Sequence, residues 1–172
     1  NPTTVKMLSG SITMGVGQFC TNPGLIIGIE GEDLNQFILE LGNQLSHIEP
    51  DVMLTQQICN SYNEEIEDLL NHEEITLETR ANKSEKLNNG RATLTSVPAQ
   101  SFIKNPKLSQ EIFGPYSLIV RCEDQSELDQ VLGSLDGQLT GSIIGDNSEL
   151  SLYDSSIKIM EKKVGRLIFN GV

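Results

Sequence analysis

The chain contains the stretch Gly15-Val16-Gly17-Gln18-Phe19-Cys20-Thr21-Asn22-Pro23-Gly24, followed by Leu25-Ile26-Ile27. This stretch combines a cysteine thiol with glycine and proline residues that determine the local backbone conformation. Glycine permits sharp turns and close backbone approach. Proline fixes its own φ and keeps the preceding residue out of the helical region. The apolar run after Gly24 is typical of a strand covered on both faces of a parallel sheet. The sequence therefore predicts a thiol at the end of a short segment, directly before a buried strand.

Two interpretations of Cys20 are open from the residues alone. Free cysteine is among the most buried residue types, so Cys20 can be a packing residue. A backbone N–H beside a nucleophile is also the usual material of an oxyanion hole, so Cys20 can be a reactive thiol. Spacing alone favours the packing role.

The rest of the chain alternates between helical and strand patterns. Apolar residues at spacings of three and four predict a helix that leads to the cysteine (Val5, Leu8, Ile12 and Val16), and further helices near 34–48, 55–70, 124–135 and 150–163. Runs of apolar and β-branched residues predict strands at 25–29, 75–79, 92–97, 116–121, 140–145 and 166–170. This order predicts a single α/β domain over residues 1–172, with a mostly parallel sheet flanked by helices.

Charge and composition exclude several functions. The 172-residue chain has a formal net charge of −12, which disfavours nucleic acid and anionic membrane surfaces as partners. No apolar run has the length of a membrane span and no signal peptide is apparent. The three cysteines (Cys20, Cys59 and Cys122) are widely spaced, which favours a reducing cytoplasm. We expect no metal site, because the histidines stand alone and no Cys-x-x-Cys occurs.

An acidic cluster in the predicted 55–70 helix has two interpretations. Glu64, Glu65, Glu67 and Asp68 can be read as a general-base or metal site, or as a solvated helix face. The solvated face is favoured, because no other motif converges on these residues.

Three segments, taken together and in this order, resemble the aldehyde dehydrogenase family. They are the Gly17–Gly24 stretch, Glu111-Ile112-Phe113-Gly114-Pro115, and Gly165-Arg166-Leu167-Ile168-Phe169-Asn170-Gly171. The first is especially similar to the branch of ketoglutarate-semialdehyde and fatty-aldehyde dehydrogenases. The likeness covers nearly the whole chain and implies the fold of the family's catalytic domain.

The resemblance implies a role for each site residue. Cys20 looks like the nucleophile, and Phe19, Thr21 and Asn170 look like parts of the substrate pocket. Glu111 looks like the carboxylate that accepts the nicotinamide ribose hydroxyls, and a carboxylate suits a diol. Phe113 looks like the aromatic wall beside the nicotinamide ring. Without the resemblance, the residues favour a tight turn at Glu111–Pro115, and Asn170 stays open between a pocket residue and a turn asparagine after a strand.

The family chemistry implies a cysteine thioester, with NADP or NAD as cofactor and an aldehyde, such as ketoglutarate semialdehyde, as substrate. Family members are much longer, and their dinucleotide-binding domain and general base precede the region that resembles this chain. We therefore expect the remainder of the parent enzyme as a partner, a homo-oligomer at full length, and no activity from these residues alone. A non-catalytic domain that keeps the fold for assembly or binding is the alternative.

Overall fold

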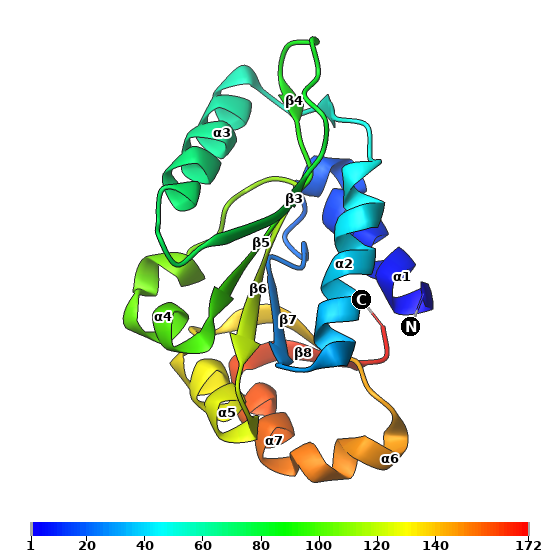
Figure 1. Ribbon diagram of the computed structural model, residues 1–172, viewed down its shortest axis with the longest axis vertical. Helices are drawn as coiled ribbons and strands as arrows, with labels where there is room; N and C mark the ends of the chain where they lie inside the picture. Colours follow the sequence, from blue (N-terminus) through cyan, green and yellow to red (C-terminus); the bar gives the residue numbers. More distant parts are fainter. Residues whose placement is uncertain (1, 172) are drawn as a thin grey trace.

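The computed structural model describes residues 2–171, apart from the side chain at position 147. At its centre is a four-stranded sheet in the order β1-β6-β5-β3 (Figure 1). β1 and β5 both run parallel to β6, and β3 runs antiparallel to β5. The predicted α/β fold with a mostly parallel sheet is confirmed. The strands are β1 (Leu25–Ile29), β3 (Thr76–Arg80), β5 (Thr93–Pro98) and β6 (Tyr116–Cys122).

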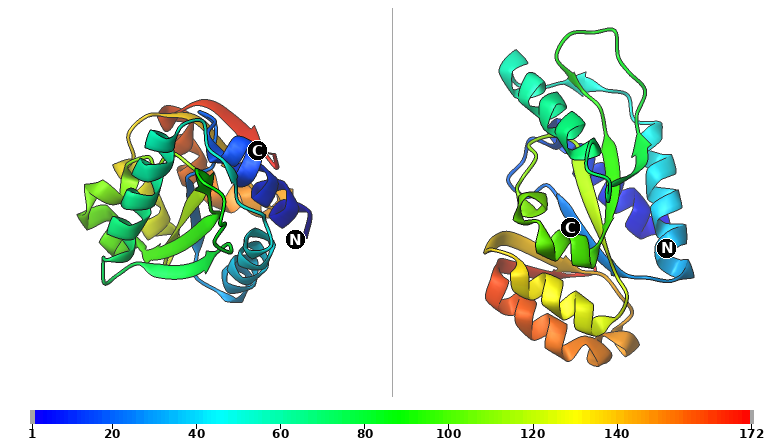
Figure 2. Two further views of the ribbon diagram at one scale, coloured as in Figure 1. Left: turned by 90° about the horizontal axis from the view of Figure 1, so that it is seen from above. Right: turned by 60° about the vertical axis from the view of Figure 1, so that its left-hand side comes forward.

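Helices cover both faces of this sheet, because its central strands alternate apolar residues between two cores. Ile119 of β6 belongs to the core under α1 (Pro2–Thr13) and α2 (Glu32–Ser46). Leu118 and Val120 belong to the opposite core, under α3 (Gln56–Leu70), α4 (Ala99–Lys104) and α5 (Gln125–Ser134). Figures 1 and 2 show α1 and α2 on one side of the sheet and α3 and α4 on the other.

Local signals set the ends of the predicted helices. The Thr55 hydroxyl caps α3 by accepting from the Ile58 N–H at 3.1 Å. The Asp124 carboxylate caps α5 by accepting from the Glu127 N–H at 2.9 Å. The Glu127 carboxylate accepts in turn from the Glu123 N–H at 2.7 Å, one residue before the position expected for a capping box. Acidic residues begin α2, where the helix dipole favours them.

The C-terminal part forms a second layer below the main sheet (Figure 1). Its strands, β7 (Gln138–Ile143) and β8 (Val164–Phe169), pair in parallel. The connection between them contains α6 (Asn147–Leu150), η3 (Ser151–Tyr153) and α7 (Asp154–Lys163). The Ser155 and Ser156 hydroxyls tie α7 to α5 by donating to the Asp129 carboxylate at 2.8 and 2.5 Å.

Two short strands extend from the other end of the molecule. β2 (Asp51–Val52) and β4 (Asn89–Gly90) pair antiparallel, and the loop after β3 leads into β4. The Asn89 side chain donates to the Pro50 carbonyl at 2.9 Å and holds this pair to the end of the segment after α2.

Several predictions near strand and helix ends are wrong. Leu25–Ile29 is a strand as predicted, but it is half-buried rather than covered on both faces, because β1 lies at the sheet edge. The first helix ends at Thr13, and Val16 has left-handed backbone (φ 59°) in the 3-10 turn η1 (Met14–Gly17). The predicted last helix is split into α6, η3 and α7. Sequence patterns also do not predict α4. The Asn105-Pro106 dipeptide, which is typical of a turn, lies at the start of the 3-10 turn η2 (Pro106–Ser109).

Candidate active site

Cys20 lies in an exposed turn between η1 and β1. The Asn22 N–H donates to the Phe19 carbonyl at 3.0 Å, which places Cys20 and Thr21 at the centre of the turn. Cys20, Thr21 and Phe19 are exposed, whereas Cys59 and Cys122 are buried. In the part of the chain that the structure describes, the N–H groups of Cys20 and Thr21 donate no hydrogen bond. Core packing is therefore not the role of Cys20 in this fold.

Left-handed backbone brings the chain into this turn. Gly15, Val16 and Gly17 have φ values of 54°, 59° and 67°. A β-branched residue rarely adopts this region, so surrounding structure must hold Val16 there. Val16 is 8% exposed and packs close to Gly90, where an added Cβ would lie 2.8 Å from the Val16 Cγ1. Burial of Val16 thus anchors the approach to the thiol.

The turn also bonds to itself and to the chain after β2. The Gln18 side-chain amide donates to the Gly15 carbonyl at 2.9 Å. The Gln18 side-chain oxygen accepts from the Leu54 N–H at 2.9 Å. Gln18 therefore ties the segment before Cys20 to the chain after β2.

The thiol segment packs directly on the Glu111–Pro115 stretch. A Cβ added to Gly17 would lie 2.2 Å from the Gly114 carbonyl carbon and 2.4 Å from the Pro115 nitrogen. The Asn22 side-chain amide donates to the Gly114 carbonyl at 3.1 Å. The Asn22 Oδ1 is buried and has no hydrogen-bond partner among the described residues. Two of the three motifs, far apart in sequence, are thus in contact.

Tyr62 of α3 holds the Glu111–Pro115 stretch from the other side. An added Cβ at Gly114 would lie 2.3 Å from the Tyr62 ring, so only glycine allows this approach. The Tyr62 hydroxyl donates to the Arg91 carbonyl at 2.6 Å. Burial raises the pKa of Tyr62 to about 12. The helical stripe predicts Tyr62 as a core residue, but does not predict its position beside this motif.

A hollow of about 170 Å³ opens between α3 and Phe113. One wall is a polar ridge of α3, and Tyr62 lies at the base. Phe113 is 36% exposed on the other wall, and Glu111 is exposed nearby. Burial, and then the charge of Glu111, raises the pKa of Glu65. The residues that line the hollow are Gln57, Ile58, Ser61, Tyr62, Glu65 and Phe113.

Asn170 belongs to the small sheet. It has left-handed backbone (φ 52°), and its N–H donates to the Ile143 carbonyl at 2.9 Å. Its side-chain oxygen accepts from the Gly145 N–H at 3.0 Å. The hydrogen bonds described for Asn170 thus hold it to the end of β7 and not to the thiol turn.

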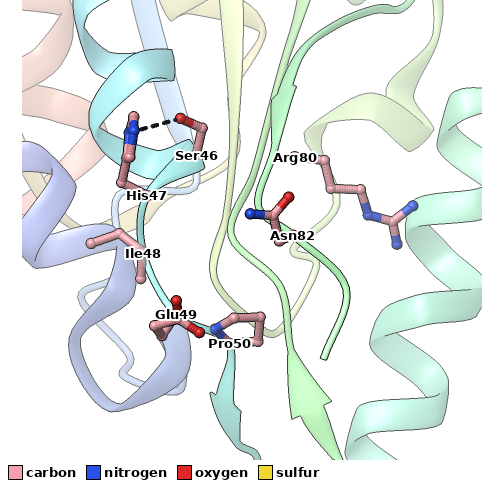
Figure 3. A pocket seen from close by; sticks show the side chains of 7 residues that line it. All are labelled: Ser46, His47, Ile48, Glu49, Pro50, Arg80 and Asn82. Atoms are coloured by element: carbon pink, nitrogen blue, oxygen red, sulfur yellow. Dashed lines mark hydrogen bonds between the residues drawn. The ribbon is translucent and has the colours of Figure 1, made fainter. Parts of the chain in front are cut away.

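A larger hollow, about 280 Å³, lies between the end of α2 and the segment after β3. Figure 3 shows that the Arg80 side chain points away from its His47 side. The Arg80 guanidinium instead pairs with Glu67 at 2.6 Å, and the His47 ring lies 3.1 Å from the Ser46 hydroxyl. The Ser46 hydroxyl donates to the Asn43 carbonyl at 2.7 Å and Arg80 is paired with Glu67, so we place the candidate site at the thiol turn and the Phe113 hollow.

Residues 2–171 contain no helix long and apolar enough to cross a membrane. They also contain no group of three or more histidine, cysteine and acidic side chains positioned to hold a metal ion.

Curated relatives of this chain are semialdehyde dehydrogenases. The chain is 40% identical over 164 residues to alpha-ketoglutaric semialdehyde dehydrogenase 2 of Azospirillum brasilense, covering 94% of this chain and 31% of the relative. It is 36% identical over 162 residues to alpha-ketoglutaric semialdehyde dehydrogenase of Acinetobacter baylyi, with the same coverage of 94% and 31%. The chain thus spans about a third of the length of these relatives. No family model matches it.

Solved aldehyde dehydrogenases share the fold at low sequence identity. The Delta-pyrroline-5-carboxylate dehydrogenase of Mycobacterium tuberculosis gives a TM-score of 0.80 at 16% identity, covering 99% of this chain and 33% of that one. The same enzyme bound with NAD gives a TM-score of 0.77. A NAD-dependent benzaldehyde dehydrogenase of Corynebacterium glutamicum gives 0.75 at 15% identity, covering 99% and 37%. Because the sequence likeness and the shared fold both extend over nearly the whole chain, it belongs to the aldehyde dehydrogenase family.

Proposed function

We propose that residues 1–172 are the thiol-bearing catalytic domain of an NAD(P)-dependent aldehyde dehydrogenase, with Cys20 as the nucleophile. The observation that carries this proposal is the contact of Gly17 and Asn22 with the Gly114–Pro115 peptide. This contact joins the turn that bears an exposed thiol to the loop that bears Glu111 and Phe113.

The exposed turn suits attack on a carbonyl. The Cys20 thiolate sulfur forms a bond to the aldehyde carbon, and the carbonyl oxygen becomes an oxyanion. The N–H groups of Cys20 and Thr21 have no partner among the described residues, so they are available to donate to that oxyanion. Phe19 and Thr21 flank the thiol and are assigned to the substrate pocket. Asn170 is assigned there by family likeness alone.

Glu111, Phe113 and the adjoining hollow fit the nicotinamide end of the cofactor. An aromatic side chain offers a wall for a flat ring, and an exposed carboxylate accepts hydrogen bonds from a diol. When bound, NAD(P) supplies the oxidant, because it accepts the hydride from the carbon that is bonded to Cys20. The resulting Cys20 thioester is released by water as a carboxylic acid, and a general base from outside these residues assists that step.

A semialdehyde such as ketoglutarate semialdehyde is the proposed substrate, because the curated relatives carry that name. We further propose that the general base and the dinucleotide-binding domain belong to the remainder of a longer enzyme. That enzyme is a cytoplasmic homo-oligomer, and residues 1–172 alone are inactive. NAD and NADP are both retained as candidate cofactors.

Replacement of the thiol tests this proposal. In the full-length enzyme, Cys20→Ala is expected to abolish NAD(P)-dependent aldehyde oxidation and to leave the melting temperature nearly unchanged, because Cys20 is exposed. Cys59→Ala, which alters a buried thiol on α3, is the control and retains activity. Full activity in Cys20→Ala would refute the nucleophile assignment.

A further inference from the structure

We propose that Glu65 is a specificity-determining residue of the cofactor subsite, and that it favours the oxidised, cationic nicotinamide over the neutral reduced one. This inference rests on the proposed function, since it concerns the same subsite. It adds a residue on α3 to the Glu111–Pro115 side of that site.

Glu65 and Phe113 line the same hollow, from α3 and from the Glu111–Pro115 stretch. Gln57, Ser61 and Glu65 are four residues apart along α3, so their side chains form one ridge. This ridge, Phe113 and Tyr62 line the open hollow of about 170 Å³. A flat ring that packs on Phe113 therefore lies next to Glu65.

Two carboxylates of like charge act on this hollow. Glu65 lines it directly, and Glu111 lies two residues before Phe113. The pKa of Glu65 is raised by burial and by the charge of Glu111, which supports their proximity. Two negative charges held near each other are destabilised, and a cation placed between them relieves that cost.

The structure describes no cation that already fills this role. Within residues 2–171, the ion pairs join Arg80 to Glu67 and Arg121 to Glu30 and Glu78, and Lys158 pairs with Asp154. Glu65 and Glu111 are absent from these pairs, so their charge remains available to a ligand. The oxidised nicotinamide ring carries one positive charge and the reduced ring carries none. The subsite therefore discriminates between the two forms by charge.

The test measures dissociation constants for NAD(P)⁺ and NAD(P)H in the full-length enzyme, using NAD(P)H fluorescence and competition by NAD(P)⁺. Glu65→Gln removes the charge and keeps the shape of the side chain. It is expected to shift the ratio of the two constants toward NAD(P)H by about fivefold, the size of one close charge–charge interaction in a water-like medium. Glu65→Asp keeps the charge and retains most of the wild-type ratio.

The matched control is Glu64→Gln on the same helix, since Glu64 is exposed and does not line the hollow. It is expected to leave the ratio unchanged. A Glu65→Gln ratio equal to that of wild type, or an equal shift in Glu64→Gln, overturns the inference.

Failure of this inference is distinct from failure of the proposed function. If the wild-type enzyme binds NAD(P) and oxidises aldehyde through Cys20 while Glu65→Gln keeps its ratio, only the Glu65 assignment is wrong. If the wild-type enzyme neither binds NAD(P) nor oxidises aldehyde, the proposed function itself is wrong. Melting temperatures of all variants show that a shifted ratio does not arise from unfolding.

Discussion

Gly17→Ala tests the contact between the two motifs. Gly17 has φ of 67°, and an added Cβ would lie 2.2 Å from the backbone of Gly114. Left-handed backbone costs a residue with a Cβ about 1 to 2 kcal/mol. Forcing a methyl group into a packed site costs about 1 to 3 kcal/mol more. Because backbone atoms cannot rotate away, we expect a total destabilisation of about 2 to 5 kcal/mol.

The assay is urea and thermal unfolding of the variant beside wild type. For a chain of 172 residues, the expected loss lowers the melting temperature by about 5 to 15 °C. Gly10→Ala is the matched control, because Gly10 lies in α1, is exposed and has open space around its Cβ position. Alanine in a helix interior is more favourable than glycine by about 0.5 to 1 kcal/mol, so Gly10→Ala stabilises slightly.

Local and global effects of Gly17→Ala are separable. If the motifs come apart without global unfolding, the melting temperature falls little, but the labelling rate of Cys20 changes relative to that of Gly10→Ala. If both the stability and the labelling rate of Gly17→Ala match those of Gly10→Ala, the packing of Gly17 on Gly114 is not as described, and the reasoning that joins the motifs fails.

Two further predictions concern α3. Tyr62→Phe removes the hydroxyl that donates to the Arg91 carbonyl at 2.6 Å and leaves the Thr93 hydroxyl, at 3.1 Å, as its donor. Unfolding in urea should therefore show a loss of about 1 kcal/mol, and an unchanged midpoint would contradict a stabilising role for the Tyr62 hydrogen bond. Glu65→Gln should raise the melting temperature at neutral pH but not below pH 4.5, its ordinary pKa. The sign follows from the raised pKa, since the cost of such a carboxyl begins near its ordinary pKa, grows as the pH rises, and is complete above the raised native-state pKa. A gain confined to acidic pH contradicts it.

Sequence prediction is most accurate where a single local pattern determines the structure. The apolar stripes of α2 and α3 predict those helices within two residues, because a stripe of this length has one way to be buried. Thr55 before α3 and Asp124 before α5 act as caps. Cys59 is buried on the α3 stripe.

Prediction from sequence fails where contacts between distant segments determine the structure. Leu25–Ile29 has the composition of a fully covered strand, but its place at the sheet edge leaves it half-buried, and composition does not encode strand order. Pro98 ends β5 and also precedes α4, a helix of six residues that is too short to show an apolar stripe. Val16 fits the helical spacing, yet burial beside Gly90 holds it in left-handed backbone.

The candidate site is predicted in part. Sequence motifs identify Cys20 and the Glu111–Pro115 stretch, but their contact depends on Gly17 and Gly114, whose close approaches appear only in three dimensions. The prediction of a solvated acidic face on α3 is confirmed for Glu64, which is exposed. Glu65 is also exposed, but it lines the Phe113 hollow, and its charge pattern does not distinguish it from its neighbours.

Mass-resolved alkylation of the cysteines in the full-length enzyme, with and without NAD(P) and an aldehyde, tests the central claim most directly. Exposure alone predicts that Cys20 is labelled before the buried Cys59 and Cys122, so the decisive quantity is protection. The account predicts that the aldehyde slows labelling of Cys20 and leaves the other two rates unchanged. Equal labelling of Cys20 with and without the aldehyde would show that the fold is kept without the chemistry, and would contradict Cys20 as the nucleophile.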